Sequence, residues 1–401
     1  MLVTKVKQLA KLFVQKIIPI NNNRVVFTSF NGHYSDSPKY ISEALHLIES
    51  GIEIIWLVES QYQSNLPDYI TVVTPSSLKG VLYYASAKCI VDNVYGGKEV
   101  WLKSTSIKSR FAFKLLSCLK KKKNQTVITT WHGTAFKRMG RDQINNTILD
   151  FSCHNTILLL GDEHTSRILT HLTFGRIPSF VVGSPRNEIL QTIRTNVEQL
   201  KEKLNLPASK RIVLFAPTFR NDGTDVAKKN ILRSGINQIN MMDFDILFQT
   251  LSCKFDGDWT MVLRFHYHVD NLVDWEELQK KYPGKFVNGN THDDMAEYLA
   301  CTDVLITDIS SCMFDFMTTN KPIFLFFPDI LHYETIERGF YFPIEDLPFQ
   351  LADDFPKLID NIKSFDLEEY QKGIFHLMKK LEIRDPAGSS MKIAEIILQN
   401  M

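Results

Sequence analysis

The stretch TVITTWHGT, residues 126–134, is the most informative part of this chain. Its β-branched run predicts a buried parallel strand over Thr126–Thr130, and His132 and Gly133 follow at the carboxyl end of that strand. Open α/β sheets bind their ligands at this end. Gly133 lets the backbone approach a bound group closely, and His132 suits proton transfer near neutral pH. On this stretch alone, a catalytic site and a histidine that caps a turn both remain open.

The composition is that of a globular protein without a disulfide framework. The chain has 401 residues, of which 44% are hydrophobic and 23% are charged, and this length suits two or three domains. Six cysteines are scattered without a CxxC pair, which favours reduced thiols over disulfides or a zinc site. No run of about 18 apolar residues occurs, so we expect no transmembrane helix.

The net charge of +1 conceals two halves of opposite charge. Residues 1–150 contain 20 Lys and Arg and 10 Asp and Glu, a balance of +10, whereas the remainder contains 26 and 35, a balance of −9. The N-terminal half is therefore expected to face something anionic, such as membrane lipid, nucleic acid or an anionic polymer.

Residues 1–18 favour the membrane among these partners. Their apolar side chains fall on one helical arc and their lysines and glutamines on the other, and the pattern ends near Pro19. A basic amphipathic helix of this kind lies in the interface of anionic membranes, although a helix docked on its own domain would show the same pattern. A cleavable signal is disfavoured, because no continuous apolar core is present. Residues 110–123 are also apolar and basic, and no nucleic-acid-binding motif accompanies the charge.

Short apolar runs alternate with helical patterns along the chain, which predicts parallel sheets with helices on both faces. We expect two Rossmann-like domains that face an interdomain cleft. The predicted strands are 24–29, 53–58, 70–73, 89–93, 126–130, 156–160, 180–182, 211–216, 260–264, 285–287, 304–307 and 323–327. The predicted helices are 37–49, 76–85, 187–204, 243–254, 271–281, 293–301, 310–319 and 366–382.

Two strands of the second half lead directly into cationic side chains. The strand 211–216 is followed by Thr218 and Arg220, and the strand 260–264 ends in Arg264 and His266. Arg264 and His266 are two positions apart, so they point the same way on an extended chain. A cation beside a histidine suits a phosphate ligand, and an arginine held by a local carboxylate is the alternative.

A third strand, 304–307, leads into Asp308, Ser310 and Ser311 and then into a helical pattern. Either serine suits the N-cap position, and a helix N-terminus is a ready anion site. A capped helix without a ligand is the alternative. No Walker lysine motif and no GxGxxG occur, which disfavours an ATPase and a dinucleotide oxidoreductase. No carboxylate cluster has metal-ligand spacing, so we expect catalysis without a required cofactor, with Mg²⁺ dependence left open.

Together, the cationic and N–H donors at the strand ends of the second half and the histidine of the first half indicate transfer chemistry on a diphosphate. The motifs that carry these residues also resemble those of a known family. In order along the chain they resemble those of the CDP-glycerol glycerophosphotransferases of teichoic-acid and related polymer synthesis. The family's usual forms are WHGTPLK, GYPRND, APTWR, RxH and TDYSSxxFD. This chain has WHGTAFK at 131–137, GSPRNE at 183–188, APTFR at 216–220, RFH at 264–266 and TDISSCMFD at 307–315. Ala135, Ser184 and Ile309 depart from the pattern but leave its polar groups intact.

The resemblance implies a fold of the GT-B type in which the C-terminal domain binds most of the CDP-alcohol. His132 would be the general base on the acceptor hydroxyl, and His266 would act on the diphosphate as the second catalytic residue. The implied substrate-binding residues are Gly133, Thr134, Lys137, Arg186, Thr218, Arg220, Arg264, Asp308, Ser310, Ser311 and Asp315. We expect a membrane-associating helix over 1–20, an acceptor-side domain over 21–186 and a donor domain over 187–401, with the last helices free to pack back on the N-terminal domain.

The implied reaction is transfer of glycerol phosphate or ribitol phosphate from CDP-glycerol or CDP-ribitol to a lipid-linked acceptor, with release of CMP. It would take place at the cytoplasmic face of the membrane, on an anionic surface and without nucleic acid. Absence of the long N-terminal region of some polymerases favours a primase or a short-chain enzyme. A GT-B glycosyltransferase that uses a nucleotide sugar and a non-catalytic membrane scaffold are the alternatives. The polyol, the acceptor, processivity and homo-oligomerisation remain open.

Overall fold

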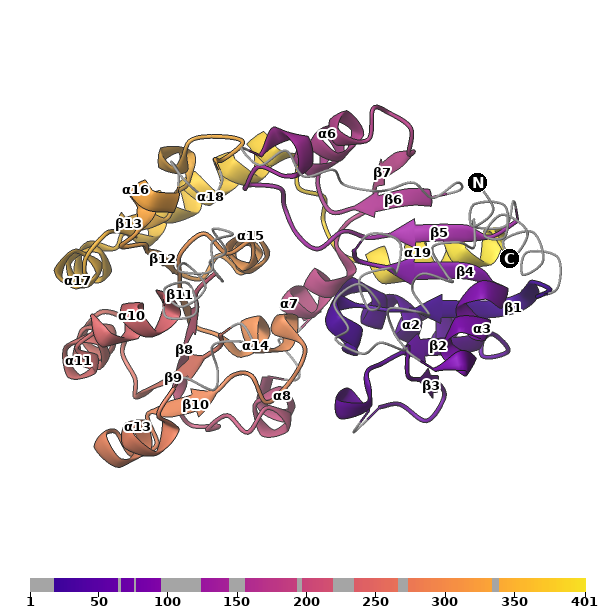
Figure 1. The fold of residues 1–401 in the computed structure, drawn as a ribbon. Coiled ribbons are helices and arrows are strands. Elements are labelled where there is room, and N and C mark those ends of the chain that lie inside the picture. Colours follow the sequence, from indigo (N-terminus) through magenta and orange to yellow (C-terminus); the bar gives the residue numbers. More distant parts are fainter. Residues whose placement is uncertain are drawn as a thin grey trace, which may run out of the picture. The chain divides into compact units, whose positions relative to one another are not determined.

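The computed structural model describes residues 18–63, 66–75, 77–94, 124–143, 156–192, 197–218, 234–265, 273–333 and 339–401. These residues form two compact units, each built around a parallel sheet (Figure 1). The first unit takes its described residues from Met1–His132, Ile148–Glu188 and Ile383–Met401, and the second from Gly133–Thr147 and Ile189–Glu382. Residues 1–17 of the predicted N-terminal helix and the basic segment 110–123 lie outside the described residues, and residues 18–20 are not helical.

The first sheet has seven strands in the order β3-β2-β1-β4-β5-β6-β7, and every neighbouring pair is parallel. Its strands are β1 Asn21–Phe27, β2 Glu53–Leu57, β3 Thr71–Val73, β4 Ala87–Asp92, β5 Thr126–Thr129, β6 Thr156–Leu160 and β7 Ser179–Val181. Its helices are α2 Asp36–Ile48, α3 Leu78–Ser86, α6 Glu163–Leu172 and α19 Ser389–Gln399, and α7 Glu188–Thr192 runs across the boundary between the units.

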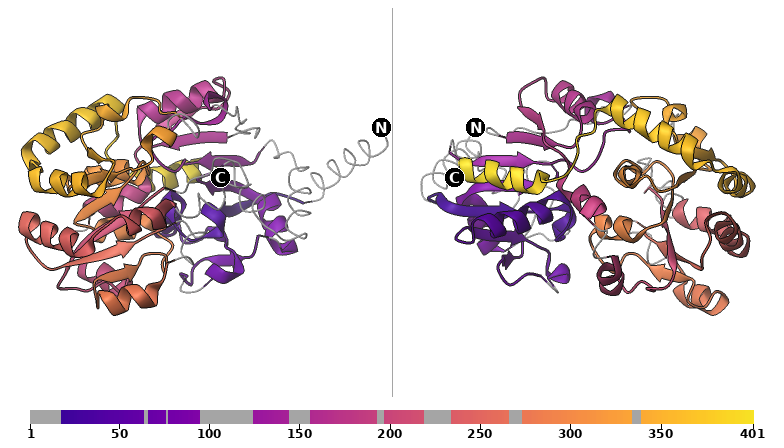
Figure 2. Two further views of the ribbon diagram at one scale, coloured as in Figure 1. Left: turned by 60° about the vertical axis from the view of Figure 1, so that its left-hand side comes forward. Right: turned by 180° about the vertical axis from the view of Figure 1, so that it is seen from behind.

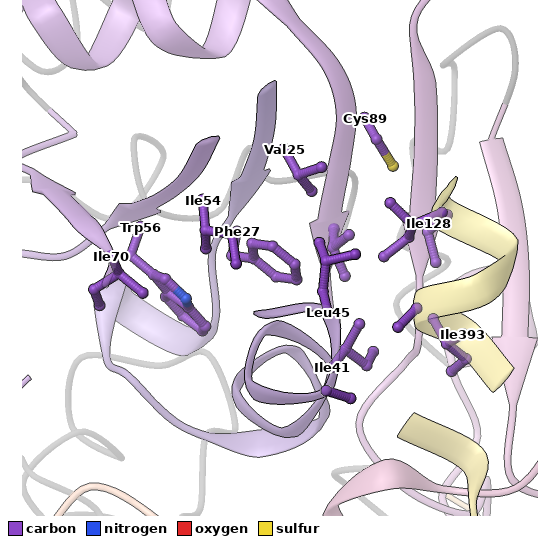
Figure 3. Close-up of a cluster of buried hydrophobic side chains, with 14 of the residues drawn as sticks. Val25, Phe27, Ile41, Leu45, Ile54, Trp56, Ile70, Cys89, Ile128 and Ile393 are labelled. Carbon is purple, nitrogen blue, oxygen red and sulfur yellow. The ribbon is translucent and has the colours of Figure 1, made fainter. Parts of the chain in front are cut away.

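Alternate residues of β1 pack against helices on opposite faces of this sheet, as the period of a strand requires. Val25 and Phe27 lie in a cluster with side chains of α2 and α19, whereas Val26 lies in a second cluster with α3. Figure 3 shows Ile41 of α2 and Ile393 of α19 pointing toward the strands of the first cluster. Seen from behind in Figure 2, α19 lies over the sheet beside α2. A helix near residue 390 thus completes a core that begins at residue 25.

The second sheet has six parallel strands in the order β10-β9-β8-β11-β12-β13. Its strands are β8 Arg211–Ala216, β9 Trp259–Leu263, β10 Phe286–Asn288, β11 Val304–Thr307, β12 Ile323–Phe326 and β13 Gln350–Ala352. Its helices are α8 Val197–Lys203, α10 Ser234–Asn240, α11 Phe244–Phe255, α13 Trp275–Lys281, α14 Met295–Cys301, α15 Cys312–Phe316, α16 Ile330–His332, α17 Phe355–Ser364 and α18 Leu367–Leu381. Figure 1 shows α11 and α17 on one side of this sheet and α8 and α14 on the other.

Aspartate side chains set the start of six helices. Each accepts a hydrogen bond from a backbone N–H of the first turn, which satisfies a donor that has no partner inside the helix and places a negative charge at the positive end of the helix dipole. These aspartates are Asp162 of α6, Asp243 of α11, Asp274 of α13, Asp294 of α14, Asp354 of α17 and Asp366 of α18. Among the described residues, no helix is long and apolar enough to cross a membrane.

Candidate active site

Each sheet has one point at which its strand order reverses. The reversal falls between β1 and β4 in the first sheet and between β8 and β11 in the second. In open α/β sheets, ligands bind outside the carboxyl ends of the strands at such a point. The strand β5, which leads to His132, is paired with β4 and therefore ends beside the first reversal.

The chain turns sharply just before His132. Trp131 has a φ of 57°, a left-handed conformation that bulky residues rarely adopt. His132 is half-buried, and its Nδ1 lies 3.0 Å from the backbone carbonyl oxygen of Asn93. The ring of Phe30 meets the imidazole nearly at right angles, with 5.1 Å between the ring centroids. Strained backbone, a polar contact and an aromatic neighbour together hold the imidazole at the carboxyl end of β5.

The contact with Asn93 determines which imidazole nitrogen carries the proton. A carbonyl oxygen can only accept a hydrogen bond, so Nδ1 must donate, and in the neutral ring it is the protonated nitrogen. The lone pair is then on Nε2, the nitrogen able to take up a proton. This is the arrangement that a general base requires.

The boundary between the two units falls inside the WHGTAFK motif, between His132 and Gly133. Gly133 has a φ of 140°, and the segment after it packs within the second unit. Lys137 forms an antiparallel bridge with Phe340, and Phe136 stacks on Phe340 with 4.5 Å between the ring centroids. Thr134 is half-buried. The predicted base therefore belongs to the first unit, and the predicted binding residues that follow it in the motif belong to the second.

Arg186, which follows β7 in the short helix Pro185–Asn187, has a carboxylate partner inside its own unit. Its Nη1 lies 2.9 Å from Oδ2 of Asp36, and the two side chains are 9% and 10% exposed. The Oδ1 of Asp36 accepts the backbone N–H of Ser37 in the first turn of α2. The ion pair thus ties the motif at 183–188 to the start of α2.

Asp308 and Thr218 are joined across the reversal of the second sheet. Asp308 is fully buried, and its carboxylate lies 2.9 Å from the backbone nitrogen of Thr218 and 2.6 Å from the hydroxyl of Thr218. The N–H of Ile309 also donates to this carboxylate, at 2.5 Å. One buried acid therefore fixes the backbone at the ends of both β8 and β11.

Arg264, just beyond β9, donates to backbone carbonyls of the loop between β10 and α14. Its guanidinium contacts the carbonyl oxygens of Gly289, of His292 at 2.7 Å and of Asp293 at 2.8 Å. The ring of Tyr298 lies 5.1 Å from its central carbon. Burial lowers the pKa of Arg264 from its ordinary value, against the opposing effect of nearby acids. The structure thus shows Arg264 organising a loop at the carboxyl edge of the sheet.

The two predicted serines precede a short helix. Ser310 and Ser311 are half-buried and lie before the five-residue α15, which continues into the 3₁₀ helix Met317–Thr319. The side chain of Ser311 makes no capping hydrogen bond. Asp315 lies within α15 and is 9% exposed. Burial raises the pKa of the Cys312 thiol between them to about 11.

Two predicted residues, Arg220 and His266, lie outside the described residues. In the part of the chain that is described, no three His, Cys, Asp or Glu side chains gather as a metal site would require. Sequence reasoning missed Asn93 and Asp36, the partners of His132 and Arg186. The signal for Asn93 was available, since it is the polar last residue of the predicted strand 89–93.

Comparison with known proteins agrees with the resemblance drawn from the motifs. Residues 10–399 match the family described as CDP-glycerol:poly(glycerophosphate) glycerophosphotransferase. The teichoic acid glycerol-phosphate transferase of Staphylococcus aureus is 28% identical, over 94% of this chain and 94% of that protein. The teichoic acid poly(glycerol phosphate) polymerase of Staphylococcus epidermidis is also 28% identical, over 93% of this chain but only 50% of that protein.

Among solved structures, a variant of the wall teichoic acid polymerase TagF soaked with CDPG matches with a TM-score of 0.76 and 25% identity, over 100% of this chain and 95% of that chain. The prediction of two parallel-sheet α/β domains of the GT-B type is confirmed. The chain belongs to the CDP-glycerol:poly(glycerophosphate) glycerophosphotransferase family and is a phosphotransferase enzyme of teichoic acid synthesis.

Proposed function

We propose that this protein transfers glycerol phosphate from CDP-glycerol to a hydroxyl of a lipid-linked acceptor, with His132 as the general base. The observation that carries the proposal is the Nδ1 contact of His132 with the carbonyl of Asn93, which leaves Nε2 as the basic nitrogen. CDP-glycerol is favoured as the donor because the relatives compared above are named for glycerol phosphate.

In the proposed step, Nε2 of His132 takes the proton of the acceptor hydroxyl as its oxygen attacks the β-phosphorus of CDP-glycerol. The bond between that phosphorus and the bridging oxygen breaks, and CMP leaves with the electron pair. A positioned base is typically worth about 10²–10⁴-fold in rate. The family motif gives the second catalytic role, at the diphosphate, to His266.

The donor is proposed to be held by the second unit. Thr134, Lys137, Ser310 and Ser311 supply hydroxyl and ammonium donors of the kind that phosphate oxygens accept. Arg220 would add a guanidinium. For Thr218, Asp308 and Arg264 we propose a supporting part, because their contacts fix the backbone at the strand ends. Gly133, Arg186 and Asp315 stay in the proposed set on the strength of the motifs.

The activity test measures CMP release from purified protein with a synthetic lipid-linked acceptor. We expect release with CDP-glycerol, slower release with CDP-ribitol and no nucleotide release with a UDP-sugar. The mass of the product gives the polyol and the number of units added. Nucleotide release with a UDP-sugar and none with either CDP-alcohol would instead support a glycosyltransferase.

The test of His132 is its replacement by glutamine. We expect His132→Gln to lower kcat by about 10²–10⁴-fold while far-ultraviolet circular dichroism stays unchanged. His376→Gln is the matched control, because His376 makes the same kind of Nδ1 contact, 2.7 Å from the carbonyl of Lys372, on the exposed face of α18. Normal turnover by His132→Gln would remove the base assignment.

We also propose that the protein associates peripherally with an anionic membrane through residues 1–18. The support is the basic amphipathic pattern of that segment. Deleting residues 1–18 should weaken sedimentation with vesicles of anionic lipid but not change the weak sedimentation with neutral vesicles. Equal sedimentation of the two forms with anionic vesicles would end the anchor proposal.

A further inference from the structure

Three buried polar side chains contact one another in sequence close to His132, just after β1 and β4 and just before α2. Asn93, Ser29 and Ser35 are 1%, 3% and 6% exposed. The side-chain amide of Asn93 donates to the hydroxyl of Ser29 at 3.1 Å, and that hydroxyl lies 3.4 Å from the hydroxyl of Ser35. The backbone carbonyl of Asn93 faces Nδ1 of His132 at 3.0 Å.

Burying a group of polar side chains lowers the stability of the fold unless they form hydrogen bonds with one another. An unsatisfied buried polar group costs about 1–3 kcal/mol, and apolar side chains at these positions would avoid the risk. These three side chains are not part of the sheet, since β1 and β4 end before them, at Phe27 and Asp92. What this group does reach is the imidazole of His132.

The carbonyl of Asn93 needs this support because the sheet no longer fixes it. The N–H of Thr130 bonds to the carbonyl of Asp92 at 2.9 Å, and Asn93 comes one residue after β4 ends. Beyond that point the imidazole of His132, and not a strand, meets the carbonyl of Asn93. At this point, the hydrogen bond from the side-chain amide of Asn93 to the hydroxyl of Ser29 anchors the residue.

We propose that Asn93, anchored by Ser29, is the positioning residue that holds His132 with its proton on Nδ1 and its lone pair on Nε2. It touches no substrate and acts through the histidine. The inference rests on the proposed role of His132 as the base and goes beyond it, because it names what prepares the base. Mutation of groups that orient metal-binding imidazoles typically lowers affinity or activity by about 10–100-fold, and we expect a loss near the lower end here.

The first experiment compares Asn93→Ala and Ser29→Ala with wild type. Both should lower kcat about tenfold and leave the KM for CDP-glycerol within about twofold, since the donor is held elsewhere. The matched control is Thr28→Val. The hydroxyl of Thr28 is buried beside Ser29 but has no hydrogen-bond partner among the described residues, so its removal should leave kcat unchanged.

The second experiment reads the tautomer directly and does not need turnover. Long-range proton–nitrogen spectra of histidine-labelled protein distinguish a protonated Nδ1 from a protonated Nε2, and the signal of His132 is identified by its loss in His132→Gln. Wild type and Thr28→Val should show one tautomer, protonated at Nδ1. Asn93→Ala and Ser29→Ala should show a mixture.

The two experiments separate failure of this inference from failure of the proposed function. If wild type releases no CMP from CDP-glycerol, the spectra still decide whether Asn93 fixes the tautomer. If the spectra of Asn93→Ala and Ser29→Ala match wild type and their kcat is unchanged, the inference is overturned. Should Asn93→Ala fail to fold, the smaller change Ser29→Ala decides alone.

Discussion

The carboxyl edges of the two sheets use charge in different ways. At the first edge two opposite charges form an ion pair, between the guanidinium of Arg186 and the carboxylate of Asp36. At the second edge the charges meet backbone dipoles: Asp308 accepts the N–H groups of Thr218 and Ile309, and Arg264 donates to three carbonyls. The strand order is shared as far as the sixth strand, so the difference lies in the loops.

This difference decides what a single substitution leaves behind. Removing Arg186 at the first edge leaves the carboxylate of Asp36 buried without its guanidinium partner. Removing a charge at the second edge leaves neutral N–H or C=O groups without a partner, which costs less for each group. It also shows that a charged residue at a strand end can be a structural support for the loops around a site.

The largest effect is expected for Arg186→Leu. It should lower the free energy of unfolding of the first unit by about 3–5 kcal/mol, because the carboxylate of Asp36 stays buried. Urea unfolding gives the size, and hydrogen–deuterium exchange should confine the loss to the first unit. In the double variant with Asp36→Asn most of the stability should return, since neither charge of this pair remains. A double variant as unstable as the single one would contradict the charge-to-charge description.

For Arg264→Met we expect the free energy of unfolding to fall by about 3 kcal/mol, because three carbonyls lose their donor. Arg264→Lys should lose roughly half as much, since an ammonium supplies donors without the planar fork. Faster hydrogen exchange should appear in residues 289–301, next to the carbonyls concerned, and not in the first unit. Exchange unchanged there in Arg264→Met would show that the loop holds its shape without the guanidinium.

For Asp308→Asn we expect a loss of about 2 kcal/mol, because the amide retains one acceptor but turns a donor toward the N–H of Thr218. Thr218→Val removes the hydroxyl bond to Asp308 but keeps the backbone N–H bond, and should lower the free energy of unfolding by about 1 kcal/mol. Urea unfolding measures both. Equal losses would mean that the hydroxyl, and not the backbone N–H, is the important partner of Asp308.

The smallest effect concerns pH. Burial raises the pKa of Cys312 from 9.0 to about 11, so the folded protein holds the thiol proton more tightly than the unfolded chain does. The resulting stability is complete below pH 9.0 and is lost as the pH rises through about 11. Between pH 8 and pH 10, the free energy of unfolding of wild type should fall by about 1 kcal/mol more than that of Cys312→Ala. Parallel losses in the two proteins would show that another group causes the alkaline instability.

The fold could be predicted from the sequence where local patterns carry the information. Apolar runs of three to six residues identified β1–β12 to within a few residues, and their alternation with helical patterns predicted the parallel sheets. The strand β13, Gln350–Ala352, was missed because it contains no β-branched residue and begins with a glutamine. The helices α6, α17 and α19 were also missed, and the pattern of α6 is largely polar. No local pattern could pair α19 with α2, since that contact joins opposite ends of the chain.

For the candidate site too, single residues could be predicted from local patterns and long-range contacts could not. His132 could be found because it follows a clear strand, and Asp308 and Arg264 were found for the same reason. The contacts of the site residues could not be predicted, since Asp36 is 150 residues from Arg186 and the acceptors of Arg264 are backbone carbonyls, which any residue type provides. Motifs identify the polar groups of a site, whereas contacts decide which groups support the others.

The place of α19 has a consequence for the order of folding during synthesis. Ile393, Ala394 and Ile397 are fully buried in the core of the first unit, together with strands made more than two hundred residues earlier. During synthesis the β-strands of this unit therefore emerge from the ribosome long before the helix that covers them. The second unit, closed by residue 382, has all its strands and helices sooner. The two units are therefore completed in the reverse of the order of their strands along the chain, and the apolar face that α19 covers stays open until residues 389–399 emerge.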